Sequence, residues 1–343
     1  MARLAILVLS IVAWTAMAAP PFPGGILDTT GKTAFLAGDE GVLAVELEYG
    51  SVLWTCREAH LPLLVAGDQL FAIGYHANHV FSVLALDLTS QGKKVSKTEV
   101  TDLPRWIVTQ GNDRNTFDCR WEQQKQYLLV EWEATSKSEG GPDKQARGLV
   151  RINLETGRVD TPPLRLQAPR PPSSPPIYLE KKAIRWQGRA GGAHLAVVQE
   201  ELPNSRPGRR DQTLSLHGWD VHTGKASPAR ELMRGSRLAL LQDMDGKHLW
   251  LRDAALDSAD ASPRPWSVVS ILDGHEVARV PMVPGIRQAT TIGNRAFGLS
   301  VAPAPDAFAG PSPRKIVQLT AINLDTQKII WQRPLGRSLL QPH

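Results

Sequence analysis

The chain has 343 residues, 42% of them hydrophobic, and a formal net charge of +5 at pH 7. The basic residues are scattered through the predicted strands and loops, without a run of like charge or an aromatic-interleaved basic patch, so no nucleic-acid partner is expected. A chain of this length can bury one large core or two small ones.

The first residues indicate export. Met1-Ala2-Arg3 is a short positive start, an apolar run follows from Leu4 to Met17, and Ala16-Met17-Ala18 fits the small-x-small rule for cleavage. We therefore expect a signal peptide in residues 1–18, with an uncleaved anchor as the alternative. No later apolar run reaches the length of a membrane span. Residues 19–343 are expected to form a single domain that is periplasmic or secreted.

One pattern recurs along the chain, an alternating strand followed by a tight turn and a second strand. The Asp, Asn or Glu that ends the first strand can accept hydrogen bonds from the turn, and a glycine supplies the positive φ that the turn needs. The last copy has Gln327 in place of this glycine, so we expect a distorted turn there. The six copies lie at 42–54, 83–95, 149–159, 216–225, 267–277 and 319–331.

Upstream of each copy lies a second hairpin-like pair. Examples are 237–242 with 248–252, turned by Asp245-Gly246, and 286–292 with 295–301, turned by Gly293-Asn294. Four strands per unit, repeating every roughly 40 to 65 residues, are typical of propeller blades. The sequence thus predicts an all-β fold, a β-propeller of four-stranded antiparallel blades. Six blades are favoured, and a seventh completed by Ile26 to Thr30 is the alternative.

The end of the chain offers a way to close the ring. Ser338 to Gln341 follows Trp331 at nearly the distance by which Leu61 to Val65 follows Trp54, so it resembles an innermost strand without its blade. We expect it to dock into the blade formed by the N-terminal strands, because an open sheet edge invites aggregation.

The copies at 321–331, 153–157 and 220–224 resemble the Ala-x-Asp-x-x-Thr-Gly-x-x-x-Trp signature of pyrroloquinoline-quinone-like propeller repeats, although only Trp54 and Trp331 keep the tryptophan. That family includes quinoprotein alcohol dehydrogenases and the propeller lipoprotein of the outer-membrane barrel-assembly machine. The resemblance covers nearly the whole mature chain. It implies either a binding propeller or a quinone-dependent enzyme. The adjacent cysteines and acidic calcium site of the enzymes have no counterpart here, and neither does the lipid-attachment cysteine of the lipoprotein.

Insertions rich in Gly, Pro, Ser and charge separate most of the copies, at 136–146, 202–212, 256–265 and 302–315. Each is expected between the second and third strands of its blade, on the same face as the long blade-to-blade connections at 98–115 and 161–176. Repeat proteins usually bind on the face where insertions cluster, so this face is the candidate binding surface. The alternative is that these are tolerated surface loops without a partner.

Four residues on two innermost strands are the candidate channel-binding residues, Arg120 and Trp121 on one strand and Arg185 and Trp186 on the next. Arginines facing the channel would form an anion site, and tryptophans would form a stacking platform. The alternative is that the tryptophans pack between blades and the arginines are solvated. The remaining tryptophans are expected to be packing residues, namely Trp106, Trp132, Trp219, Trp250 and Trp266.

The two cysteines, Cys56 and Cys119, can pair in an exported protein, or can be two separate small residues. His76-Ala77-Asn78-His79 has a spacing seen in metal sites but no third ligand in view, and we favour solvated or hairpin-capping histidines. For a metal-dependent hydrolase or lactonase, the inner strands offer only Asp243 and Glu122. No nucleophile elbow, phosphate-binding loop or calcium loop is present.

These observations predict an exported, non-enzymatic binding or scaffold propeller whose partner is another protein or a cell-envelope component, with no cofactor. The alternative is a quinone- or metal-dependent propeller enzyme of the dehydrogenase or lactonase/hydrolase type.

Overall fold

In a computed structural model, the described residues are 21–75, 80–102, 115–136, 144–156, 158–160, 183–190, 193–202, 211–220, 223, 225–254, 264–281, 283–303 and 315–336. The regular elements of this part of the chain are the strands β1 to β25. The expected signal peptide, residues 76–79 and Ser338 to Gln341 lie outside it. Within the described residues, no helix is long and apolar enough to cross a membrane.

The strands form six sheets, which we name blades A to F in chain order. Blade A contains β1 (Pro21–Phe22), β2 (Gly25–Leu27), β3 (Thr33–Gly38), β4 (Gly41–Glu46) and β5 (Val52–Cys56). Blade B contains β6 (Leu61–Ala66), β7 (Gln69–Tyr75), β8 (Val80–Asp87) and β9 (Lys93–Asp102). Blade C contains β10 (Asn115–Gln124), β11 (Tyr127–Ser136), β12 (Lys144–Asn153) and β13 (Val159–Asp160).

Blade D contains β14 (Ala183–Ala190), β15 (Ala193–Glu201), β16 (Gln212–Trp219) and β17 (Arg230–Gly235). Blade E contains β18 (Leu238–Gln242), β19 (His248–Asp253), β20 (Trp266–Ser270) and β21 (Glu276–Val280). Blade F contains β22 (Ile286–Ile292), β23 (Arg295–Pro303), β24 (Lys315–Asn323) and β25 (Lys328–Gly336).

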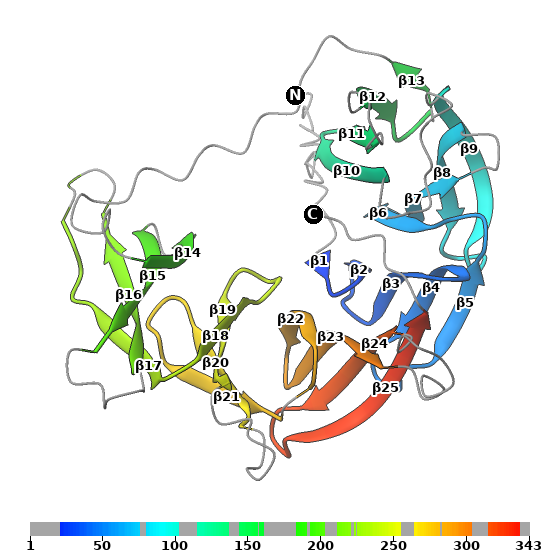
Figure 1. Ribbon diagram of the computed structural model, residues 1–343. Coiled ribbons are helices and arrows are strands. Elements are labelled where there is room, and N and C mark those ends of the chain that lie inside the picture. Colours follow the sequence, from blue (N-terminus) through cyan, green and yellow to red (C-terminus); the bar gives the residue numbers. More distant parts are fainter. Residues whose placement is uncertain are drawn as a thin grey trace, which may run out of the picture.

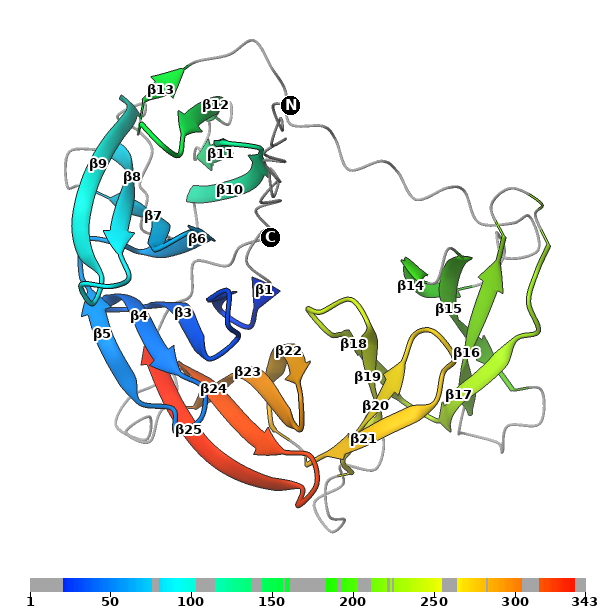
Figure 2. The same ribbon diagram turned by 180° about the vertical axis from the view of Figure 1, so that it is seen from behind.

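In every blade the strands follow one another in chain order and neighbouring strands are antiparallel, as in β6 to β9. The blades stand around an arc, with A, B and C along one arm and F, E and D along the other (Figures 1 and 2). The fold is a β-propeller, and the preferred count of six is confirmed. Ile26 does not open a seventh blade, because β2 pairs with β3 inside blade A.

Hydrophobic clusters lie between the blades. Alternating side chains of each strand face the neighbouring sheet, and five adjoining pairs of blades share a buried cluster, namely A with B, B with C, D with E, E with F, and F with A. Among the described residues, no such cluster joins C to D, the blades at the two ends of the arc (Figure 1). The fold is therefore held together mainly by sheet-on-sheet burial.

Blades A and F, at opposite ends of the sequence, pack directly on one another. Phe22 and Leu36 of blade A share one cluster with Phe297 and Leu319 of blade F. The expected docking of Ser338 to Gln341 into the N-terminal blade concerns residues outside the described part of the chain and stays a prediction. Within the described residues, β2 pairs with β3 in that blade.

The repeat turn between the third and fourth strands keeps one geometry in several blades. The residue at its end has positive φ, with values of 70° for Gly50, 75° for Gly92, 65° for Gly274 and 56° for Gln327. Asn323 Oδ1 accepts the Thr326 backbone N–H at 2.8 Å, close to the 2.7 Å of the corresponding Thr223–Asp220 bond. The expected distortion at Gln327 is therefore wrong, because the glutamine adopts the left-handed conformation itself.

The fourth residue after this positive-φ position lies on or beside the outermost strand of the blade, and we call it the docking position. Two docking positions hold tryptophan, and each indole ring lies against the turn glycine of the next blade along the arc. A Cβ added to Gly50 would lie 2.5 Å from the ring of Trp331, and one added to Gly92 would lie 2.5 Å from the ring of Trp54. The six docking positions are Trp54, Ser96, Thr161, Pro228, Ala278 and Trp331, of which Thr161 lies outside the described residues.

The element order places the insertions where they were expected. Residues 137–143, 202–211, 254–265 and 304–314 connect the second and third strands of blades C, D, E and F. These insertions are shorter than the sequence suggested, because Ser136, Lys144 and Ala302 belong to the neighbouring strands. Because the strands are antiparallel, these loops open at the blade end opposite to the repeat turns.

Candidate functional site

The two Arg-Trp pairs lie on β10 and β14, the first strands of blades C and D. Arg120 and Arg185 are exposed. Trp121 packs against the cluster between blades B and C, and Trp186 is buried in the cluster between D and E. Trp186 also covers Gly188, where a Cβ would lie 2.3 Å from its ring. Trp186 therefore has the packing role that was the alternative to a channel site, whereas Trp121 is half-buried.

The other tryptophans inside the described residues also serve packing, because Trp132, Trp219, Trp250 and Trp266 are all buried. Cys56 on β5 is a half-buried free thiol. Cys119 is on β10, and blade B separates that strand from β5 (Figure 1). The suggested disulfide between them is therefore not formed in this structure.

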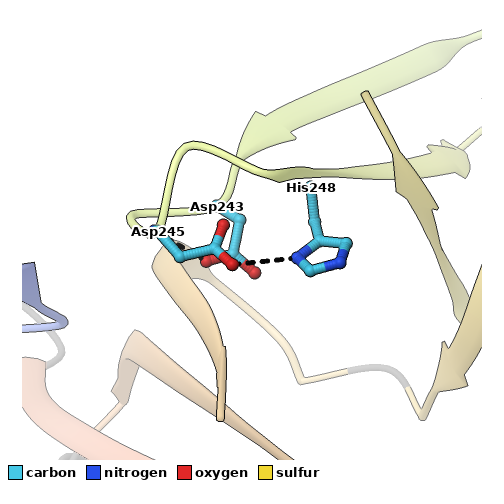
Figure 3. Close-up of side chains that lie close together, drawn as sticks. All are labelled: Asp243, Asp245 and His248. Atoms are coloured by element: carbon cyan, nitrogen blue, oxygen red, sulfur yellow. Dashed lines mark hydrogen bonds and ion pairs between the residues drawn. The ribbon is translucent and has the colours of Figure 1, made fainter. Parts of the chain in front are cut away.

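Three ionisable side chains converge at the hairpin between β18 and β19, Asp243, Asp245 and His248 (Figure 3). Asp243 is completely buried, whereas the side chains of Asp245 and His248 are 21% and 24% exposed. Asp243 forms an isolated parallel bridge with Ala289 of β22, so the hairpin lies against the next blade. The three ligand atoms lie within 4.8 Å of one another.

Each carboxylate in the cluster accepts hydrogen bonds. Asp243 Oδ1 accepts the Asp245 backbone N–H at 3.1 Å. Asp243 Oδ2 accepts the indole N–H of Trp250 at 3.2 Å and the hydroxyl of Thr291 at 3.1 Å. Asp245 Oδ2 lies 3.0 Å from His248 Nδ1, and the Thr291 hydroxyl lies 3.1 Å from the same nitrogen. Asp243 thus joins its own hairpin, the buried Trp250 and blade F.

Burial raises the pKa of Asp243 above the ordinary value, and the charge of nearby Asp245 acts in the same direction. The hydrogen bonds that Asp243 accepts oppose this effect but are outweighed. The carboxyl is therefore easier to protonate in the folded protein than in the unfolded chain.

Blade A contains a second copy of this loop. Asp28-Thr29-Thr30-Gly31-Lys32 connects β2 to β3 as 243–247 connects β18 to β19, and Gly31 and Gly246 both have a φ of 69°. Asp28 Oδ1 accepts the Lys32 backbone N–H at 2.9 Å, and Oδ2 accepts the Thr30 hydroxyl at 2.7 Å. The shared Asp-x-x-Gly-Lys sequence is thus a turn device in both blades.

A divalent cation with nitrogen and oxygen ligands would find its donors in Asp243, Asp245 and His248. Asp243 Oδ2 already accepts two hydrogen bonds, from Trp250 and Thr291, whereas Oδ1 accepts one from the Asp245 backbone and keeps a lone pair for a metal. Glu122, the other acidic residue considered from the sequence, is exposed on β10 in blade C and does not join the cluster. The arrangement fits a buried hairpin anchor better than a metal centre.

The sequence pointed to Asp243 but treated Asp245 only as a turn residue and did not consider His248. The spacing Asp-x-Asp-x-x-His on a tight hairpin could have indicated their convergence. The contribution of Thr291 could not, because it depends on how blades E and F pack.

Grooves open between the blades on the side of the repeat turns. One of about 450 Å³ lies between blades D and E, one of about 160 Å³ between B and C, and one of about 400 Å³ between F and A. The first two contain the docking positions Pro228 and Ser96, where no tryptophan is present. The third lies at the junction that contains Trp331, so these grooves do not depend on a missing tryptophan.

No family model matches the chain, and no curated protein matches it. Among solved structures, Hsv2 from Kluyveromyces lactis is 7% identical with a TM-score of 0.35, covering 95% of this chain and 100% of that one. The dihydro-heme d1 dehydrogenase NirN is 12% identical with a TM-score of 0.33, covering 94% and 67%. A chain of the nidogen/laminin complex is 8% identical with a TM-score of 0.30, covering 88% and 95%. At these distances, no ligand or partner of those proteins can be transferred to this chain.

Proposed function

We propose that this chain is an exported, non-enzymatic β-propeller that acts as a binding or scaffold protein through its loop-elaborated face. One observation supports the proposal most directly. The insertions of blades C, D, E and F all fall at the same connection, between the second and third strands. Insertions confined to one connection of a repeat are characteristic of a binding face.

The partner class that we propose is another protein or a component of the cell envelope. Export to the periplasm or outside the cell rests on the positive start, apolar run and cleavage pattern of residues 1–18. Mass spectrometry of the protein from its native host tests this part. A mature chain that begins at residue 19 or 20 supports export, and an intact Met1 on a cell-internal protein contradicts it.

The loop face is tested with a site-specific photocrosslinker. It is placed at Phe308, in the loop of blade F, and at Thr30 on the opposite side of the blades as the matched control. We expect a discrete adduct from Phe308 only. The partner identified by mass spectrometry is then purified, and its affinity is measured for variants in which residues 304–314, or each of the other three loops, are replaced by a short Gly-Ser linker.

At least one shortened loop should weaken the affinity tenfold or more without lowering the melting temperature. If all four shortened variants bind the partner as tightly as the parent chain, the loops do not contribute to binding. A matched insertion at Gly31, where the surrounding space is open, controls for nonspecific effects of a linker.

A metal- or quinone-dependent enzyme is the second candidate, and the Asp243, Asp245 and His248 cluster is the observation that favours it. Metal analysis and quinone-linked dye reduction on the purified chain test it. A stoichiometric divalent metal that is lost in His248→Ala would place this candidate first.

A further inference from the structure

We propose that the outer rim where blades F and A meet is the interface of a homodimer of this chain. Five exposed apolar side chains form this surface, which we call the rim patch: Tyr49, Val52 and Leu53 of blade A, and Ile329 and Ile330 of blade F. The patch lies on the outermost strands β5 and β25 and on the repeat turn before β5 (Figure 1). It is at the repeat-turn end of the blades, so the interface is independent of the loop face proposed above.

Exposed apolar side chains are concentrated near the repeat turns. Within the described part of the chain, every exposed large hydrophobic residue lies within three residues of a positive-φ turn residue. Five of these eight residues, with exposed fractions from 38% to 67%, belong to the rim patch. The others are Val95 in blade B, and Leu272 and Val277 in blade E. Single exposed apolar residues are normal, whereas a group of them on one surface is typical of an interaction site.

Contacts between the blades bring the two halves of the patch together. The ring of Trp331 lies over Gly50, where an added Cβ would come within 2.5 Å of it. Arg333 also donates two hydrogen bonds to the Gly50 carbonyl. Ile330 and Tyr49 directly adjoin Trp331 and Gly50 in the chain, so both border the same contact between blades F and A.

The strand pairing places the other members of the patch. Val52 pairs with Val45, which belongs to the buried cluster between blades F and A, so Val52 is on the side of β5 that faces blade F. Leu53 and Ile330 are the extra residues of β-bulges, since the register of each strand shifts at that point. A bulge leaves its extra residue outside the regular pairing.

Blades A and F differ from the others at the second and third residues after the turn. Both have two large aliphatic residues there, Val52-Leu53 and Ile329-Ile330. The other pairs contain a charged residue or only small residues: Lys94-Val95 in blade B, Val159-Asp160 in C, Ala226-Ser227 in D and Glu276-Val277 in E.

β5 and β25 are the last strands of their sheets, so one edge of each has no neighbouring strand within its sheet. Charged residues on an edge strand are a common protection against pairing with another chain. These two strands lack such a charge at the two positions, and they lie in adjoining blades. The rim patch is therefore the part of the blade edges that is best suited to association with another chain.

The charges at the two ends of the patch fit a second copy. Glu48 is exposed beside Tyr49 at the blade A end, and Lys328 is exposed beside Ile329 at the blade F end. Neither forms an ion pair with another described residue. In an isologous interface, residue i of one copy contacts residue j of the other, and j contacts i. A two-fold axis through the patch thus places Glu48 of each copy opposite Lys328 of the other, with the apolar residues packed between them.

Sedimentation velocity of the protein purified from its native host tests the proposal. We expect a reversible dimer, and Ile330→Glu and Leu53→Glu should each raise its dissociation constant tenfold or more, because a charge is buried against an apolar surface. Val95→Glu in blade B is the matched control, because Val95 occupies the position of Leu53 and is also exposed. It should change the constant less than twofold. All three side chains are exposed, so the variants should keep the melting temperature of the parent chain.

A charge swap tests the two-fold arrangement. Glu48→Lys and Lys328→Glu should each weaken the dimer severalfold, because like charges then meet across the interface. The double variant reverses the pair and should return the dissociation constant to within twofold of the parent value. Single variants without effect, or a double variant that is not restored, would show that the two patches do not meet around a two-fold axis, and the proposal is then wrong.

Other occupants of the patch would give different results. A protein that stays monomeric at every concentration up to its solubility limit, or a dimer that Ile330→Glu leaves intact, overturns the proposal. If the monomer co-sediments with phosphatidylglycerol vesicles and Ile330→Glu prevents this, the patch binds lipid instead. A photocrosslinker at Ile330 that captures a different protein and no second copy would likewise contradict the homodimer.

Discussion

The indole ring of Trp331 lies directly over Gly50, so that a Cβ added to this glycine would come within 2.5 Å of the ring. Gly50 also has a φ of 70°, and Arg333 donates two hydrogen bonds to its carbonyl, at 2.9 and 2.6 Å. Gly50 thus forms part of the repeat turn of blade A and also contacts the side chains of Trp331 and Arg333 in blade F. Side-chain contacts thus join the first and the last blade at this point.

Gly50→Ala is expected to destabilise the protein by about 2–4 kcal/mol. About 1–2 kcal/mol comes from forcing an L-residue into the left-handed conformation, and the remainder comes from displacing Trp331. The measurement is urea unfolding followed by circular dichroism.

Gly31→Ala is the matched control, because Gly31 has a φ of 69° but nothing within 4 Å of an added Cβ. It should cost only about 1–2 kcal/mol. If the two substitutions lower the free energy of unfolding equally, the contact between Trp331 and Gly50 does not stabilise the packing of blade F on blade A.

Gln327 occupies the turn position that glycine holds in the other repeats. The docking position of the preceding blade is Ala278, so no indole ring faces this turn and a side chain is tolerated. The backbone strain remains, since Gln327 has a φ of 56°.

Gln327→Gly should therefore stabilise the protein by about 0.5–1 kcal/mol. Glycine relieves the backbone strain, and part of this gain is offset because glycine increases the conformational entropy of the unfolded chain. The midpoint of urea unfolding is the readout. Lys328→Gly, on the adjoining strand residue outside the positive-φ region, should instead lower stability. A loss of stability in both variants would show that Gln327 is not strained.

The blade architecture could be predicted from the sequence because each blade is specified locally. Alternating apolar residues, an Asp or Asn at the strand end and a glycine in the turn are all visible within one repeat. The position of the insertions followed from the same pattern. β2 was anticipated only in part, as a strand from Ile26 to Thr30 that would complete a seventh blade, because three residues flanked by turns give no periodicity.

Features that depend on how neighbouring blades pack could not be predicted from the sequence. Gln327 was expected to distort its turn because only its own φ preference was considered, whereas the size of the preceding docking residue decides what the turn tolerates. Asp243 was recognised as an acidic residue on an inner strand, but its burial comes from β22, in a different blade. The D–E groove is likewise lined by residues of two blades that are far apart in the sequence.

Asp243→Ala should destabilise the protein by about 2–4 kcal/mol, because it leaves the buried indole N–H of Trp250 without its acceptor and removes the link to Thr291. Asp28→Ala is the matched control, since it breaks the same turn at a less buried site and should cost about 0.5–1 kcal/mol. Chemical unfolding of the two variants side by side gives the comparison. Equal losses would mean that Asp243 acts only as a turn residue.

The raised pKa of Asp243 predicts a pH dependence with a definite sign. The folded protein binds the proton of this carboxyl more tightly than the unfolded chain, whose value is near 3.8. The contribution of Asp243 to stability is therefore complete below about pH 4 and declines as pH rises through the folded-state pKa, by at most about 1.4 kcal/mol per pH unit.

Asp243→Asn keeps the shape of the side chain and cannot ionise, so it should remove this decline. We expect the free energy of unfolding of the variant, minus that of the parent chain, to rise with pH above about 4 and to become constant once Asp243 is ionised in the folded state. Urea unfolding at half-unit steps from pH 3.5 to 7.5 measures the difference, and common effects of the other carboxyls cancel. A difference that falls with pH would show that Asp243 prefers to be ionised in the folded protein, held by its hydrogen bonds from Trp250 and Thr291 rather than penalised by burial. A flat difference would show that folding does not raise the pKa of Asp243.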